Sequence, residues 1–228
     1  MVHKLNILAL AGAVVLTATH PLIAEEYDWS GLYGGVNLAA PATNLTGIQD
    51  CCGDDAGDDP GNLNLGGVVG GLHIGYNVMR DATLFGLEAD LMADLGDASQ
   101  DSLSEPTPNT STISVAGLGS IRARLGRAND DGMAFLTLGA SYADATYTME
   151  DPDGTDSEGS ADLSGWGYVI GGGVALPLTE TTHLSLSYER HLFDTRVDTS
   201  DLTTDSNAED FVQLDSIDML RLAVSLRF

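Results

Sequence analysis

The chain has very few cysteines, basic residues and aromatic residues. Its 228 residues include 2 cysteines, 9 lysines and arginines, and 6% aromatic residues. The cysteines are the adjacent pair Cys51-Cys52, so they cannot join distant segments, and structural zinc needs four ligands. Three interpretations of the pair stay open: a loop feature without an essential role, a strained vicinal disulfide, or a bridge to another chain.

The shortage of positive charge limits the partners. Against 9 basic residues stand 34 acidic ones, which gives a formal net charge of -25. Nucleic-acid binding needs a basic surface, and docking on anionic lipid needs basic clusters, so both are disfavoured. The acids gather in particular segments, which favours acidic loops on an ordered frame over a disordered chain.

Long apolar runs are also missing, since a membrane-spanning helix needs roughly 20 apolar residues. The longest run, residues 5–16, follows His3 and Lys4 and precedes Leu22-Ile23-Ala24. A short positive start, an apolar run and a plausible cleavage site at residues 22–24 predict a cleaved secretory signal peptide at 1–24, leaving a domain at 25–228. Loss of Lys4 would change the charge from -25 to -26. A retained anchor helix is the alternative, which the shortness of the run disfavours.

What the chain does have is alternation with a period of two, with 27 glycines and only 7 prolines. In the last thirteen residues, Leu220, Leu222, Val224, Leu226 and Phe228 alternate with Met219, Arg221, Ala223, Ser225 and Arg227. A strand places successive side chains on opposite faces, so this segment has one apolar and one more polar wall.

Seven earlier segments repeat the pattern. The eight predicted strands are 29–38, 66–78, 84–94, 113–125, 133–144, 164–176, 183–194 and 216–228. Long connections (39–65, 95–112, 145–163 and 195–215) alternate with short ones (79–83, 126–132 and 177–182). Spanning strands of roughly 9–11 residues and this asymmetry are typical of membrane barrels. We therefore predict an all-β fold, an eight-stranded antiparallel up-and-down transmembrane β-barrel with four long extracellular loops and three short periplasmic turns.

The ionisable residues decide against a soluble lipocalin-like barrel or a sandwich. Seven of them lie opposite the large apolar residues: Glu88, Asp90, Arg122, Arg124, Glu189, His191 and Arg221. In a soluble apolar cavity each unpaired charge would cost several kcal/mol, whereas a membrane barrel places polar groups in its lumen and lipid outside. Arg190 falls on the apolar face, which predicts a place near the extracellular rim.

The same alternation makes finer predictions about the two faces. Ile113 and Val115 are expected on the lipid face and Asp94 in the lumen. Trp29 and Tyr33 suit an interfacial aromatic girdle.

Strand order predicts how the lumen charges pair. Neighbouring strands bring Glu88 and Asp90 to Arg122 and Arg124, and Glu189 to Arg221. Eight-stranded barrels barely hold their own side chains, so we expect a charge network that plugs the lumen. A gate or narrow ion path is the alternative.

Two stretches carry a resemblance to a known family. The string W-S-G-L-Y-G-G at 29–35 and the ending Leu226-Arg227-Phe228 resemble small outer-membrane β-barrel proteins of the OmpA-type membrane-domain and opacity-type porin-like family. The resemblance implies a cell outer membrane location, contact with lipid and lipopolysaccharide, and Phe228 as a signal to the barrel-assembly machinery. It also implies a non-enzymatic role in envelope structure and surface contact.

The residues also bear on three other functions: a porin, an adhesin or receptor, and an enzyme. A low-conductance porin and an adhesin or receptor acting through acidic loops stay open as alternatives. No nucleophile motif such as G-x-S-x-G is present. Ser187, Glu189 and His191 share a strand face, but alternate residues lie roughly 7 Å apart, which is loose for a triad. We expect no enzyme activity.

The third long connection has oxygen ligands at Asp151, Asp153, Asp156 and Glu158. Calcium loops space acids in this way, but the twelve-residue frame of an EF-hand is missing. A solvated, self-repelling loop is the stronger expectation, with weak calcium binding or divalent bridging to lipopolysaccharide phosphates as alternatives. We expect no cofactor.

Overall fold

The computed structural model describes residues 27–48, 65, 67–101, 110–150, 159–198 and 211–228. These residues form nine strands. Their bounds are β1 (Gly31–Ile48), β2 (Val69–Arg80), β3 (Thr83–Asp101), β4 (Thr110–Asn129), β5 (Gly132–Glu150), β6 (Gly159–Asp162), β7 (Gly165–Pro177), β8 (Thr182–Asp198) and β9 (Phe211–Arg227). Within the described residues, no helix has the length and hydropathy needed to cross a membrane.

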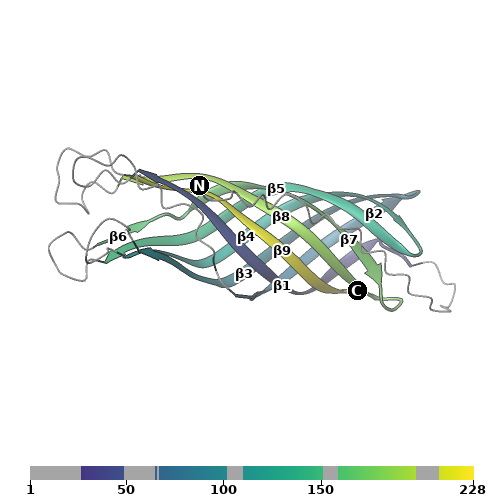
Figure 1. The fold of residues 1–228 in the computed structure, drawn as a ribbon. Helices are drawn as coiled ribbons and strands as arrows, with labels where there is room; N and C mark the ends of the chain where they lie inside the picture. Colours follow the sequence, from purple (N-terminus) through teal and green to yellow (C-terminus); the bar gives the residue numbers. More distant parts are fainter. Residues whose placement is uncertain (1–26, 49–64, 66, 102–109, 151–158, 199–210) are drawn as a thin grey trace, which may run out of the picture.

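Eight of the strands close into a cylinder (Figure 1). The sheet order is β4-β3-β2-β1-β9-β8-β7-β5-β6, and β4 also pairs with β5, which closes the ring. Every pairing is antiparallel. Among the described strands, the ninth, β6, pairs with β5 alone and prolongs that side of the cylinder. The predicted antiparallel up-and-down barrel is thus confirmed, because the period-two segments pair in chain order.

The outer wall is apolar along the middle of the cylinder. On β5, Leu136 and Leu138 are 67% and 63% exposed, whereas Thr137 between them is 4% exposed. The same alternation runs along β2, β7 and β9, as predicted. Soluble proteins rarely expose continuous apolar surface of this extent, and each square ångström facing water would cost about 25 cal/mol. This wall therefore requires an apolar solvent.

Strands run further than the sequence predicted at the end where the long connections lie. β1 continues to Ile48, β3 to Asp101 and β5 to Glu150, so the boundaries expected at residues 38, 94 and 144 were wrong. On β3 and β4 β-bulges interrupt the alternation, whereas on β5 buried and exposed positions alternate without a break from Ser141 to Tyr147 and only their polarity changes. The register shifts on β3 between Ala93 and Gly96 and on β4 between Val115 and Gly117.

The bulges exchange the two faces. One extra residue moves every following side chain to the opposite side of a strand. Ile113 and Val115 were predicted on the lipid face, but they are 0% and 1% exposed and point inward. Asp94 was predicted in the lumen, but it is exposed and has a φ of 55°. Beyond the bulges the cylinder is therefore organised like a soluble protein, with polar residues outside and apolar residues inside.

We call this part the head: residues 40–48, 94–101, 110–117, 144–150, 159–163, 193–198 and 211–217. Its interior belongs to a buried apolar cluster that includes Leu95, Ile113, Tyr147, Leu163 and Leu214. A bulge on β9 at Asp215 turns Leu214 and Val212 into the same cluster. The head core therefore covers one end of the lumen.

Trp29 and Tyr33 do not form an interfacial girdle, contrary to the prediction. They are 4% and 2% exposed and lie inside the cylinder. The outward aromatics are other residues: Tyr142, Trp166, Tyr168 and Tyr188 below the head, and Tyr76, Phe85 and Phe228 near the short turns. Two aromatic belts at the borders of an apolar wall are the pattern of a membrane barrel.

Candidate functional site: the charged layer inside the cylinder

Four strands carry the charged side chains of the lumen. β3 supplies Glu88 and Asp90, β4 supplies Arg122 and Arg124, β8 supplies Glu189, and β9 supplies Arg221. All six are buried, with at most 7% of any residue exposed. They face the axis because each occupies the alternate position to an outward apolar residue.

Glu88 is the centre of the layer. Its Oε1 accepts from Arg122 Nη2 at 2.7 Å and Arg221 Nη1 at 3.0 Å, and its Oε2 accepts from Arg124 Nη1 at 2.9 Å. The Tyr33 hydroxyl donates to Glu88 Oε2 at 2.7 Å and accepts from Arg124 Nη1 at 2.7 Å. One carboxylate therefore holds three guanidinium groups from two strands of the wall.

Arg122 and Glu189 bridge the lumen between strands that are not neighbours. Arg122 Nη1 donates to Glu189 Oε2, and Arg122 Nη2 lies 3.1 Å from Asp90 Oδ1. Glu189 Oε1 also accepts from Arg221 Nη1 at 3.2 Å and from the Ser187 hydroxyl at 3.0 Å. The order of the strands, with each strand paired to the next, predicted the contacts of Glu88 and Asp90 with β4 and of Glu189 with Arg221. It missed the transverse contacts, since only the closed ring brings β4 to β8.

Arg124 also contacts aromatic rings. Its guanidinium carbon lies 3.9 Å from the centre of the Phe135 ring and 5.7 Å from that of Tyr33. Tyr33 fits into this layer because position 75 is a glycine. A Cβ there would lie 2.4 Å from the Tyr33 ring.

The charges of the layer balance. Three carboxylates (Glu88, Asp90 and Glu189) face three guanidinium groups (Arg122, Arg124 and Arg221). Three pairs of opposite sign in a dry space attract strongly, whereas an excess of either sign would be expensive. His191 completes the predicted set. It is fully buried, and its Nε2 lies 3.9 Å from Glu189 Oε2.

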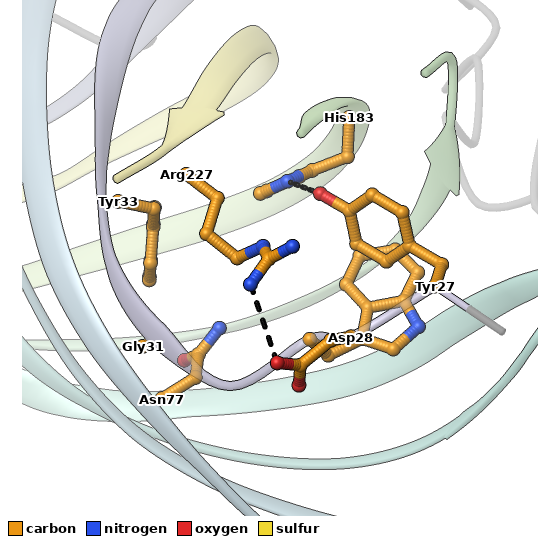
Figure 2. Close-up of a pocket in the computed structure, with 8 residues that line it drawn as sticks. Tyr27, Asp28, Gly31, Tyr33, Asn77, His183 and Arg227 are labelled. Carbon is orange, nitrogen blue, oxygen red and sulfur yellow. Dashed lines mark hydrogen bonds and ion pairs between the residues drawn. The ribbon is translucent and has the colours of Figure 1, made fainter. Parts of the chain in front are cut away.

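A second cluster lies at the turn end of the cylinder, and the period-two pattern did not predict it. The Tyr27 hydroxyl lies 3.0 Å from His183 Nδ1, and Trp29 Nε1 donates to the Asn129 carbonyl at 3.1 Å. Figure 2 shows Tyr27 and His183 facing each other, with Arg227 reaching Asp28 at 3.2 Å. Burial raises the pKa of the Tyr27 phenol above its usual value. The segment before β1 thus packs into this mouth of the lumen.

Arg190 lies on the outer wall, as its position in the alternation indicated. Its Nε and Nη2 donate to the two carboxylate oxygens of Asp218 at 2.7 and 2.8 Å, and the Tyr188 hydroxyl also donates to Asp218 at 2.7 Å. Asp218 marks the place where the outward apolar series of β9 ends toward the head. The charge is thus paired at the border of the apolar belt.

Of the remaining predicted sites, only Phe228 lies among the described residues. The acids of the proposed calcium loop, Asp151, Asp153, Asp156 and Glu158, and the pair Cys51-Cys52 lie outside the described residues. Among the described residues, no group of three or more His, Cys, Asp or Glu side chains could hold a metal ion. Phe228 is 74% exposed on the outer wall, and its backbone N–H donates to the Leu32 carbonyl at 2.9 Å.

Comparisons with known proteins agree with this geometry. Residues 7–228 match the model of the outer membrane protein beta-barrel domain family. No curated protein sequence matches the chain.

Solved structures with the same fold have low sequence identity. The outer membrane protein OprG of Pseudomonas aeruginosa is 14% identical, with a TM-score of 0.50, over 87% of this chain and 97% of that one. Neisserial surface protein A is 12% identical, with a TM-score of 0.46, over 87% and 98%. Outer Membrane Protein W of E. coli is 17% identical, with a TM-score of 0.43, over 88% and 100%. At 14% identity, the likeness to OprG indicates the fold alone.

Proposed function

Because the chain belongs to the outer membrane protein beta-barrel domain family, we propose that it is a closed barrel that anchors the head at the cell surface. It sits in the outer membrane, with the apolar wall in lipid. In this role the barrel contributes to envelope structure, the head makes surface contacts, and the lumen does not conduct.

The charged layer is the observation that carries the proposal. Arg122 is fully buried and holds carboxylates from β3 and β8 at once, so it crosses the lumen. An ion would have to separate these groups, and breaking a buried pair costs about 3–5 kcal/mol. Above this layer lies the apolar core of the head, and below it the Tyr27–Trp29 cluster. Three successive obstacles favour a plug over a gate.

Catalysis is not part of the proposal. Glu189 and Ser187 are joined by a hydrogen bond, but the carboxylate is also bound to Arg122 and Arg221. A serine held by an arginine-bound carboxylate has no general base to activate it.

The two ends of the chain have proposed roles in biogenesis. Residues 1–24 would direct export and be removed, leaving residues 25–228 as the barrel domain. Strand β9, which closes the ring against β1 and ends at the outward Phe228, would be the contact for the barrel-assembly machinery. Lipopolysaccharide would surround the wall at the level of Arg190 and the aromatic residues below the head.

Planar-bilayer recording tests the closed lumen. The purified full chain is added to a bilayer, and we expect no stepwise conductance. Gramicidin added afterwards checks that the same bilayer reports a channel. Regular conductance steps from the wild-type chain would contradict the proposal and favour the alternative of a low-conductance pore.

A further inference from the structure

The described strands of the head do not close into a cylinder. Beyond the bulges, β3 pairs with β4, β4 with β5, and β5 with β6, whereas β8 pairs with β9 and β9 with β1. The pairing of β7 with β8 stops at Gly167 and Phe193, and the pairing of β2 with β3 stops at Gly70 and Ala93. Two separate sheets therefore face each other across the head core, and they diverge toward the left in Figure 1.

Two strand edges border the gap that begins where β7 and β8 separate. We call this gap the seam; its sides are β6 (Gly159–Asp162) and the end of β8 (194–198). At the base of the seam β7 and β8 are still in contact, because a Cβ built on Gly165 of β7 would lie 2.0 Å from Thr195 Oγ1 of β8. Further out, neither edge pairs with a strand on the seam side among the described residues. The other gap lies between β1 and β3, and Leu65, which precedes β2, is part of the buried core cluster.

The hydrogen-bond pattern shows which backbone groups of β6 face the seam. The Leu163 N–H donates to the Ala145 carbonyl at 2.9 Å, and the register continues as Tyr147 with Ala161. In an antiparallel pair, residues with both groups turned to the partner alternate with residues whose groups turn away. Ala161 therefore bonds to β5, whereas the N–H and carbonyl of Ser160 point into the seam.

The surroundings of the seam are acidic. Asp144, Glu150, Asp162 and Asp194 are all exposed on or beside its two edges. The one basic side chain on these edges, Arg196, is stacked on the Phe211 ring with its guanidinium carbon 3.6 Å from the ring centre. Within the part of the chain that the structure describes, an approaching segment therefore meets a β6 edge that pairs with no strand on the seam side, beside an excess of negative charge.

We propose that β6 receives an extended, lysine- or arginine-rich segment of a partner protein as an added strand. Unpaired edges are templates for strand addition, in which main-chain hydrogen bonds give affinity and side chains give selectivity. Here Ser160 supplies the backbone donor and acceptor, and the surrounding carboxylates select positive charge. The inference rests on the proposed role of the head in surface contact and names the chemistry of the partner.

The test uses the full chain in nanodiscs of zwitterionic lipid and a fluorescent ten-residue peptide in which lysine alternates with threonine. Ser160→Pro removes the N–H that faces the seam, and a strand edge tolerates proline at such a position. Ser160→Ala keeps that N–H and is the matched control. Fluorescence anisotropy measures binding, with empty nanodiscs as the blank.

We expect the wild-type chain and Ser160→Ala to bind the peptide alike. Ser160→Pro should bind about tenfold more weakly, the effect of losing one main-chain hydrogen bond. A peptide N-methylated at every residue, or one with glutamate in place of lysine, should not bind, because the first has no N–H on either edge and the second is repelled by the carboxylates.

Three results would overturn the inference: equal binding by the proline and alanine variants, binding of the N-methylated peptide, or occupation of the edge by a second copy of the chain, seen as a dimer by light scattering. Heat-modifiable gel migration of each variant confirms that the barrel is folded. Conductance recorded on the same preparation tests the closed lumen separately, so failure of one proposal is distinguishable from failure of the other.

Discussion

Replacing Glu88 by glutamine should be among the most destabilising conservative changes in the barrel. The substitution keeps the shape of the side chain but removes the charge that holds Arg122, Arg124 and Arg221. Three buried guanidinium groups would then face two carboxylates. Removing one partner of a buried ion pair costs about 3–5 kcal/mol. We expect a loss of that size in the free energy of unfolding.

A solvent-accessible pair provides the control. Asp28 is 57% exposed in its contact with Arg227, and exposed pairs contribute about 0–1 kcal/mol. Asp28→Asn should therefore leave stability nearly unchanged. The double variant Glu88→Gln/Arg124→Gln restores the balance of charge. Its loss of unfolding free energy should therefore be about 0.5–3 kcal/mol smaller than the sum of the losses in the two single variants.

Urea unfolding from lipid vesicles, followed by tryptophan fluorescence, measures these differences. Trp29 reports on the inside of the turn end and Trp166 on the outer wall. If Glu88→Gln cost no more than Asp28→Asn, or if the double variant were simply additive, the charged layer would not be the coupled network described above.

Three further substitutions test other parts of the structure. Leu138→Arg places a charge in the middle of the lipid-facing wall and should cost about 2–4 kcal/mol in the same unfolding assay; a cost under about 1 kcal/mol would contradict the membrane position. Ile113→Asp should make the head sensitive to added protease while the barrel still migrates as a folded form, because this side chain lies in the head core; unchanged resistance would indicate an outward side chain. Gly75→Leu should displace the Tyr33 ring, because its Cζ would lie 2.4 Å from the new Cβ, and lower the unfolding free energy by about 1–3 kcal/mol; an unchanged midpoint would refute that close contact.

Most of the barrel could be predicted from alternation alone. The period-two pattern of β9 identified Arg221 as inward and Leu222 as outward, because the pleat of a strand leaves no other choice. The lumen charges followed from the same rule, and pairs on adjacent strands followed from strand order. Alternation failed at Ile113 and Val115, since a single extra residue reverses the phase and has no clear signature in composition.

The sequence by itself determined that this chain has an apolar exterior, a charged interior and connections of two lengths, because each follows from local periodicity. Closure of the ring decided the rest. It brought Glu189 of β8 against Arg122 of β4 and placed Trp29 and Tyr33 inside the cylinder. The points where the β2–β3 and β7–β8 pairings end divided the head into two sheets. These features depend on contacts between segments distant in the chain, and a periodic pattern carries no record of which distant segments meet.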